Sequence, residues 1–347
     1  MALAMRVLYI GQLRPGSTSL ARMTCLQRLG LECHPFDVTP FYRMGNRVER
    51  SLLARFQIGR GVRALNAQLL RGTHSNAFDI VWIDKGVLIY PETLSVLRSR
   101  AAHRFAVHYT PDPQLVHHKS RHFRACIPIY DLAVTTKTFE IDLYKVHGVR
   151  DLLLVQQGYG ERFAQAAEAR TADNGFSYDV CFIGHCEEHY AARLRAATSA
   201  APAAVWGPGW TRYARRHDWI RPHVKGDGIW GDEYPQALMR SRIALGLLSK
   251  QIPETTTTRT FEIPATATFM LAERTADHLA LFEEGIEVEF FSSDEEMRDK
   301  IRFYIANEAA RTTIARAGRQ RCLTSGYSDT AQLQRVVDRI SAHLGAT

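Results

Sequence analysis

The chain has 347 residues, of which 46% are hydrophobic and 23% charged, with a formal net charge of +8. These proportions are ordinary for a globular protein, and the length favours two domains over one. No apolar run approaches the roughly 18 residues that a membrane span needs, the start lacks the basic region of a signal peptide, and no cysteine belongs to a C-x-x-C pair. We therefore expect reduced thiols and a cytoplasmic protein, with peripheral attachment to the inner face of the membrane left open.

The positive charge predicts an anionic partner: a nucleotide diphosphate, an acidic glycan, a lipid headgroup or nucleic acid. Basic residues are concentrated between Arg98 and Arg124, a segment whose one acid is Asp112. The segment is either a solvated positive face or a docking surface for an anionic acceptor or a membrane. Its cations are Arg98, Arg100, Arg104, Lys119, Arg121 and Arg124.

Strand-like and helix-like segments alternate through the first half of the chain. The first strand, RVLYI (6–10), ends at Gly11, and FDIVWID (78–84) is the clearest buried strand. Alternation of this kind predicts a parallel sheet with helices on both faces. The other expected elements are a helix at 19–29, a strand at 32–38, a long helical stretch at 48–70, a helix at 91–100, and strands in RFAVHY and YDLAVTT.

The pattern restarts after a small, polar stretch at 164–175, which is typical of a linker. YDVCFIG (178–184) again runs from a strand into a glycine, and RIALGLL (242–248) is a further strand. Helices are expected from about Thr258, from a capping box that opens at Ser293, and over 308–324 and 329–344. The chain therefore predicts two facing Rossmann-like domains, 1–165 and 175–327, with a ligand in the cleft at the carboxyl ends of the strands.

GQLRPGST (11–18) resembles a phosphate-binding loop in its spacing, but Ser17 stands where the essential lysine would be. An NTPase is therefore disfavoured. The alternatives are a plain tight turn and a glycine-containing turn, with Gly16 and Ser17, that offers backbone N–H groups to an anion on the acceptor side.

Two histidine pairs have the spacing of neighbours on one helix face, His118 with His122 and His185 with His189. Neither pair comes with an H-E-x-x-H pattern or a cysteine set, so we expect no metal site.

The most informative segment is PETTTTRTFEIPATATFMLAE (253–273). Four threonines (255–258) precede a helix expected at Arg259, where hydroxyls, backbone N–H groups and the guanidinium can meet a diphosphate. Glu262 lies one turn into that helix, where a carboxylate can accept both hydroxyls of a ribose. The alternative is that Glu254 and Glu262 are two ordinary exposed glutamates.

This segment resembles the C-terminal half of group 1 glycosyltransferases, and specifically the CgeB-like (spore maturation protein) branch. The similar motifs are R-T-F-E at Arg259 to Glu262, F-E-E-G-I-E at Phe282 to Glu287, and 301–321 with Arg311 and Gly318. Upstream, DKGVLIYPETL, TPDP, YDLAVTTK and VCFIGHCEEHYAARL are also similar. The resemblance implies a GT-B fold whose last helix (328–347) returns to the N-terminal domain.

The resemblance also implies residue roles. Glu254 and Glu262 match the E-x7-E signature of retaining enzymes, in which the second glutamate contacts the donor ribose and the first lies near the transferred sugar. We expect Arg259 with Thr257 and Thr258 to stabilise the leaving diphosphate. Gly184 and Gly207 follow strands, where the phosphates can approach the backbone closely; both are assigned to the donor.

Two positions depart from the family pattern. Ala265-Thr-Ala267 stands where a glycine is usual, and Gly160 stands where an aspartate is usual. The donor sugar and the stereochemical outcome therefore stay open.

On the acceptor side we assign Lys85 and Asp112, with Asp112 as general base if the reaction inverts, together with Arg121 and Arg124. The predicted reaction moves a sugar from a nucleotide-diphosphate sugar, UDP favoured and GDP or TDP open, to a glycan, lipid-linked saccharide, protein or small molecule. No cofactor and no metal are expected. The alternatives are a sugar-nucleotide epimerase and a non-enzymatic protein that binds an anionic glycan or nucleic acid. No nucleic-acid motif occurs, so nucleic acid is not expected as a partner.

Overall fold

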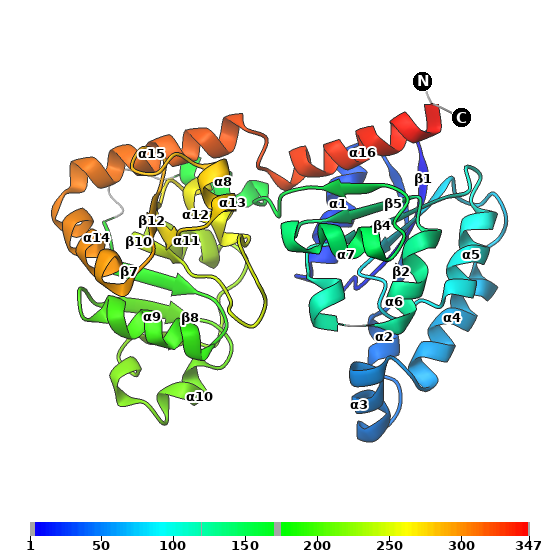
Figure 1. Ribbon diagram of the computed structural model, residues 1–347, viewed down its shortest axis with the longest axis horizontal. Coiled ribbons are helices and arrows are strands. Elements are labelled where there is room, and N and C mark those ends of the chain that lie inside the picture. Colours follow the sequence, from blue (N-terminus) through cyan, green and yellow to red (C-terminus); the bar gives the residue numbers. More distant parts are fainter. Residues whose placement is uncertain (1–3, 119, 170–174, 346–347) are drawn as a thin grey trace. The chain divides into compact units, whose positions relative to one another are not determined.

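The structure, a computed structural model, describes residues 4–118, 120–169 and 175–345. The chain divides into two compact units, one of residues 1–156 with 330–347 and one of residues 157–329. Each unit contains one parallel six-stranded sheet (Figure 1). The predicted α/β class with two Rossmann-like units is confirmed.

Unit 1 has the strand order β2-β1-β3-β4-β5-β6. The strands are β1 Arg6–Gly11, β2 Glu32–Asp37, β3 Ile80–Asp84, β4 Phe105–Thr110, β5 Leu132–Thr135 and β6 Leu152–Leu154. The α-helices are α1 Thr18–Arg28, α2 Thr39–Tyr42, α3 Arg47–Phe56, α4 Arg60–Gly72, α5 Pro91–Arg100, α6 Arg121–Cys126, α7 Ile141–Val146 and α16 Asp329–Gly345.

The side chains of β1 and β3 are buried on both faces of the sheet. Leu8 and Ile10 pack into one core cluster, whereas Val7 and Tyr9 pack into another. Successive side chains of a strand point to opposite faces, so a continuous apolar run such as RVLYI requires cover on both. This is why these strands lie centrally, with helices above and below.

The helical stretch predicted at 48–70 is two helices, α3 and α4. The break lies at Gln57, which has a left-handed backbone with φ 53°, and at Gly59, with φ 114°. Gln57 caps α3 by donating its backbone N–H to Leu53 O. At Gly61, a Cβ would lie 2.4 Å from the carbonyl oxygen of Phe41, so the glycine permits the start of α4 to approach α2 closely.

Unit 2 has the strand order β12-β11-β10-β7-β8-β9. The first strand of the unit, β7, lies between β8 and β10, so the order reverses between β7 and β10, the switch point at which ligands of such sheets bind. The strands are β7 Tyr178–Ile183, β8 Ala203–Trp206, β9 Val224–Gly226, β10 Ser241–Gly246, β11 Phe269–Glu273 and β12 Glu289–Phe291. The α-helices are α8 Glu161–Glu168, α9 Glu188–Thr198, α10 Trp210–Ala214, α11 Glu233–Met239, α12 Arg259–Ala265, α13 Ala276–Leu281, α14 Asp294–Ala306 and α15 Glu308–Thr324.

The linker predicted at 164–175 differs from what the structure has there. Helix α8 covers its first part, and residues 170–174 lie outside the described residues. Phe163 of α8 is 1% exposed and meets the Tyr234 ring edge-on at 5.2 Å. This packing ties α8 to α11, so unit 2 begins near residue 157 and not after 165.

The C-terminal helix α16 belongs to unit 1. Leu333, Val336 and Ile340 join its core, and Arg339 bonds both carboxylate oxygens of Asp151 at 2.7 and 2.8 Å. Of the helices described, none has the length and apolar character to cross a membrane.

The basic segment from Arg98 to Arg124 does not form one face. Arg98 and Arg100 precede β4 and are engaged locally: Arg98 binds Asp131, and Arg100 donates to Leu70 O and Thr73 O. Arg121 follows β4. β4 runs from the amino ends to the carboxyl ends of the strands in this sheet. The cations before it and the cations after it therefore lie at opposite ends of the strands. Lys119 lies outside the described residues.

A buried ion pair lies at the switch point of unit 1, where β1 and β3 are neighbours. Arg22 of α1 binds Asp84 at the end of β3, and the Tyr9 hydroxyl donates to the same carboxylate at 2.6 Å. Arg22 also stacks over the Tyr109 ring at 4.0 Å. The pair therefore holds α1 to three neighbouring strands.

Replacing Arg22→Met should destabilise unit 1 by about 3–5 kcal/mol, because the Asp84 carboxylate would stay buried without its cation. Hydrogen–deuterium exchange of β1 and β3 peptides would measure the loss. Lys145→Met is the matched control, since its pair with Asp142 is exposed and should hardly change protection. Equal exchange in the two variants would contradict a structural role for the buried pair.

Candidate functional site

Two glycines lie where the carboxyl ends of β7 and β8 meet. Gly207 has φ 145°, and a Cβ there would lie 1.9 Å from Gly184 O. A Cβ on Gly184 would lie 2.7 Å from the Phe182 ring and 3.1 Å from Nη1 of Arg259. Any larger residue would push these strand ends apart. Both glycines are thus required by the packing of the protein itself, and their predicted contact with a donor stays a prediction.

Arg259 joins the two strands that flank the switch point. Its Nη1 donates to Ile183 O at the end of β7 (3.2 Å), and its Nη2 donates to Leu247 O just after β10 (2.8 Å). The guanidinium carbon lies 5.3 Å from the centre of the Phe182 ring. Among the described residues, the buried Nε has no hydrogen-bond partner. A full positive charge is therefore fixed at the point of the sheet where an anionic ligand is expected.

Glu262 lies one turn into α12, and its carboxylate is held from the side. The Tyr234 hydroxyl donates to Oε2 at 2.8 Å. Burial raises the pKa of Glu262, whereas hydrogen bonds from Tyr234 and Thr258 oppose that rise. Glu262 as a whole residue is half-buried, and the bond from Tyr234 fixes the orientation of its carboxylate.

The threonines before α12 are used largely within the protein. Thr258 is the N-cap residue, and its backbone carbonyl accepts the N–H of Glu262 at 2.9 Å. The N–H of Thr257 donates to the hydroxyl of Thr260 at 3.1 Å. The predicted donation of the Thr257 amide to a phosphate therefore has an internal competitor.

Glu254 lies in the loop between β10 and α12. Its Oε2 accepts the backbone N–H of Ser249 at 3.0 Å, which closes the loop on itself. The side chain is half-buried, so Glu254 is not the ordinary exposed glutamate that the sequence left as an alternative.

Two buried glutamates that no sequence motif indicated, Glu187 and Glu273, lie at the same edge of the sheet. Glu187 accepts the Ser249 hydroxyl at 2.8 Å and approaches His185 Nε2 at 2.6 Å. Glu273 ends β11 and binds Lys250 at 2.6 Å. Burial works against the charge of Glu273, but the bonds from Lys250 and the backbone N–H of Leu248 prevail and lower its pKa. Both residues lie at or just after strand ends, and this position in the sequence could have identified them as candidate site residues.

These acids do not form a metal centre. Within the described ranges, no group of three or more His, Cys, Asp or Glu residues is arranged to hold a metal ion. His189 lies 3.3 Å from Glu273, whereas His185 lies beside Glu187. The two histidines of this pair therefore contact different carboxylates. The side chain of His118 lies outside the description.

In unit 1, the structure brings together two of the predicted acceptor-side residues. Lys85, with φ 66°, follows β3, and its Nζ lies 2.5 Å from Oδ2 of Asp112, which follows β4. Asp112 is thus an ion-paired carboxylate and not a free base. Both side chains are about one-third exposed.

Ser17 and Gly16 form the turn that starts α1. The Ser17 hydroxyl caps the helix by accepting Leu20 N at 3.2 Å and donates to Gln12 O at 2.6 Å. Gly16 has φ 79°. Of the two arginines on α6, Arg121 is exposed, whereas Arg124 is half-buried and reaches Leu115 O at 3.4 Å. The contacts of Ser17 favour the plain-turn alternative for this segment.

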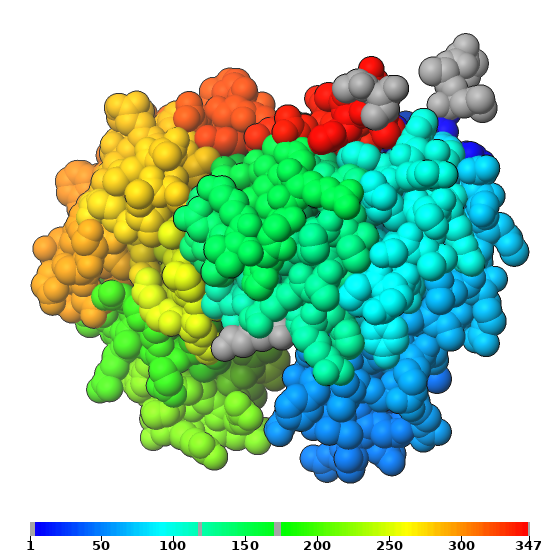
Figure 2. Space-filling model, turned by 45° about the vertical axis from the view of Figure 1, so that its right-hand side comes forward, coloured from blue at the N-terminus to red at the C-terminus, as the bar shows by residue number. Residues whose placement is uncertain are grey.

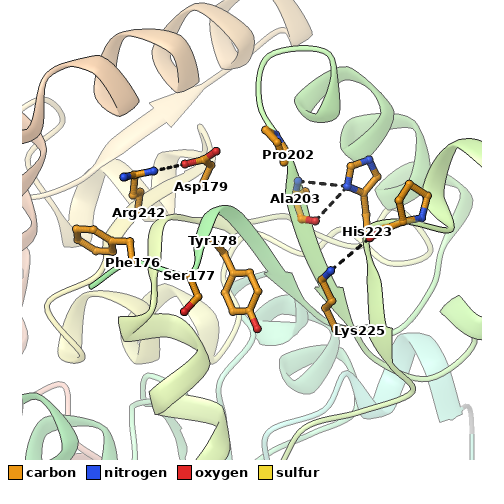
Figure 3. Close-up of a pocket in the computed structure, with 10 residues that line it drawn as sticks. Phe176, Ser177, Tyr178, Asp179, Pro202, Ala203, His223, Lys225 and Arg242 are labelled. Carbon is orange, nitrogen blue, oxygen red and sulfur yellow. Dashed lines mark hydrogen bonds and ion pairs between the residues drawn. The ribbon is translucent and has the colours of Figure 1, made fainter. Parts of the chain in front are cut away.

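A pocket of about 440 Å³ opens at the other edge of the unit 2 sheet, at the amino ends of β7 and β8. Figure 3 shows Arg242 paired with Asp179 on one side, and His223 and Lys225 on the other. Ligands of parallel sheets bind at carboxyl ends, so this pocket is not the site built by Arg259. Its lining residues are Phe176, Ser177, Tyr178, Asp179, Pro202, Ala203, Pro222, His223, Lys225 and Arg242.

Known structures share this architecture over nearly the whole chain. HepE from Anabaena in complex with UDP aligns with a TM-score of 0.64 and 15% identity, covering 97% of this chain and 100% of that one. Sucrose-phosphate synthase from Thermosynechococcus elongatus aligns with a TM-score of 0.66 and 11% identity, covering 98% and 100%. AviGT4, a glycosyltransferase involved in avilamycin A biosynthesis, gives 0.57 and 15%, covering 99% of each. At such identities the likeness shows the fold.

The sequence comparison covers a smaller part. Residues 188–338 match a family described as glycosyl transferase-like, and no curated protein sequence matches the chain. The matched segment contains Arg259, Glu262 and the other residues of α12. Residues 188–338 are thus similar to a glycosyl transferase-like family, and the chain as a whole shares its fold with these known structures.

Proposed function

We propose that the protein transfers a sugar from a nucleotide-diphosphate donor, bound at the carboxyl edge of the unit 2 sheet, to an anionic or lipid-linked acceptor. The observation that carries the proposal is the placement of Arg259 and Glu262 one turn apart on α12, at the switch point between β7 and β10. A fixed cation beside an oriented carboxylate matches two neighbouring polar parts of a nucleoside diphosphate, its phosphates and its ribose hydroxyls.

UDP is the favoured nucleotide, with GDP and TDP as alternatives. The structures of HepE with UDP and with UDP-glucose support this choice, because they have the same fold. In the proposal, Glu262 accepts the ribose hydroxyls, while Gly184 and Gly207 leave room for the phosphates beside the backbone. The motifs around Arg259 and Phe282 support placement in the CgeB-like branch.

The chemistry requires stabilisation of two opposite charges. The sugar acquires oxocarbenium character while negative charge builds on the leaving diphosphate. Arg259 would stabilise that negative charge at no cost of reorganisation, because two carbonyls already fix its guanidinium. Glu254 would lie near the transferred sugar, as in retaining enzymes, and the Lys85–Asp112 pair would meet the acceptor. The proposed reaction is retaining and uses no metal.

Glu262→Ala should raise the dissociation constant of UDP at least tenfold, because hydrogen bonds to a charged group contribute roughly 1.5–3 kcal/mol. Isothermal titration calorimetry measures it directly. Glu283→Ala, at an exposed glutamate of the same unit, is the matched control and should leave the affinity unchanged.

The raised pKa of Glu262 adds a pH dependence to this prediction. Ribose hydroxyls bind the carboxylate form, so UDP affinity of the wild type should fall as the pH drops through the raised pKa, at a higher pH than for an ordinary glutamate. The Glu262→Ala variant should lack this fall. An unchanged affinity in Glu262→Ala would rule out the ribose assignment.

Turnover should persist in excess EDTA, because Arg259 is already positioned to neutralise the leaving diphosphate. Initial rates with and without EDTA, measured after the donor sugar has been identified by thermal shift with UDP-, GDP- and TDP-sugars, provide the comparison. Loss of turnover in EDTA with recovery in magnesium or manganese would show that a metal ion, and not Arg259, neutralises the diphosphate.

The double variant Arg121→Ser/Arg124→Ser should weaken acceptor use at low salt, and less so at high salt, because ions screen exposed charges. UDP affinity should stay unchanged. Arg98→Ser is a useful control, since Arg98 lies at the other edge of the sheet and is bound to Asp131. A double variant that loses donor affinity and keeps acceptor use would reverse the assignment of the two units.

A further inference from the structure

Exposed apolar side chains gather in one short segment of unit 1. Of the twelve large apolar side chains that are exposed among the described residues, five come from α3 and the turns beside it. Val48 is 67% exposed and Phe56 56%. Exposed apolar side chains that gather on one part of a surface indicate an interaction site. In the space-filling view this blue segment forms a lobe at the lower edge (Figure 2). The five residues are Met44, Val48, Leu52, Phe56 and Ile58.

A buried side chain and an ion pair attach the helix that carries this patch to unit 1. Leu53 is its one buried side chain and packs against the start of α4, where Gly61 leaves room for it. Glu49 closes a capping box with Asn46 and also bonds Arg60 twice, at 2.7 and 3.0 Å. The helix is therefore attached to unit 1 through Leu53, while the apolar side chains of the patch stay exposed.

The apolar residues form a stripe. Val48, Leu52 and Phe56 are four residues apart, so they lie along one side of α3, one turn above the other. Leu53 lies on a different side of α3, which faces the rest of unit 1. The helix thus has two apolar faces, of which unit 1 covers one.

The stripe is surrounded by positive charge. The segment from Arg43 to Arg63 contains six arginines and a single acid, Glu49, which is bound to Arg60. The other five arginines are exposed. Apolar residues flanked by exposed cations form the pattern of a helix that lies in a membrane interface. The five are Arg43, Arg47, Arg50, Arg55 and Arg63.

We propose that α3 docks unit 1 on the surface of an anionic lipid bilayer, with Val48, Leu52 and Phe56 inserted among the headgroups and the arginines bound to lipid phosphates. A second copy of the chain would bring the same cations face to face, which like charges oppose. A nucleic acid would meet the arginines but leave the apolar stripe in water. The bilayer satisfies both features at once.

The location of α3 connects this surface to the proposed acceptor. Helices α2 and α3 follow the carboxyl end of β2, the sheet edge at which Lys85 and Asp112 also lie. A docked membrane would therefore lie on the same side of unit 1 as the acceptor-side residues, which suits a lipid-linked acceptor. Membrane docking itself does not depend on the donor chemistry, and the two are tested separately.

Flotation of the full chain with lipid vesicles tests the proposal. The protein should float with vesicles of equal parts phosphatidylcholine and phosphatidylglycerol, and not with pure phosphatidylcholine. The variant Val48→Ser/Leu52→Ser/Phe56→Ser should bind the anionic vesicles at least about tenfold more weakly, because it loses the apolar contribution to insertion. Arg47→Gln/Arg50→Gln/Arg55→Gln should bind weakly and lose most of its salt dependence.

Leu279→Ser/Ile286→Ser/Leu323→Ser is the matched control, since it removes three exposed apolar side chains from unit 2. It should bind vesicles like the wild type. Circular dichroism and UDP calorimetry should be unchanged in every variant, which separates this test from that of the proposed function. Wild-type protein that ignores anionic vesicles, a stripe variant that binds them normally, or a dimer in light scattering that the stripe variant abolishes would each overturn the proposal.

Discussion

The candidate site depends on one interaction, the two hydrogen bonds from Arg259 to the carbonyl oxygens of Ile183 and Leu247. The guanidinium donates to one carbonyl at the end of β7 and to one just after β10, so it joins the two strands that flank the switch point. It also holds α12 against β7 and β10, which fixes Glu262 one turn away. Gly184 and Gly207 follow from the same constraint, because the close approach of strand ends and guanidinium leaves no room for a Cβ.

Charged groups at the carboxyl ends of the strands are a feature of both units. In unit 1 the buried pair of Arg22 and Asp84 is completed by the Tyr9 hydroxyl, and in unit 2 Glu187 and Glu273 are bound by serine, histidine, lysine and backbone groups. A charge removed from water is tolerated only when such partners compensate it. The edges of the sheets are thereby preorganised, which is what a site for a charged ligand requires.

The basic residues of unit 1 fall into two groups that differ in their contacts. Arg98 and Arg100 serve the internal bonds of unit 1, whereas the arginines around α3 remain exposed beside apolar side chains. The first group stabilises the fold, and the second is available to a partner. Counting cations along the chain does not separate the two groups, because the difference lies in whether a carboxylate or carbonyl is within reach.

The sequence by itself determined the two parallel sheets, since continuous apolar runs such as RVLYI and FDIVWID, each followed by a helix, can be buried in few other ways. It also placed Glu262 one turn after Arg259, because helical spacing is local. Only the tertiary structure decided which groups meet: that Phe163 draws α8 into unit 2, that β4 separates Arg98 from Arg121, and that Arg259 bonds two strand ends. Hydrogen-bond and ion-pair partners come from residues far apart in the chain, so no local pattern encodes them.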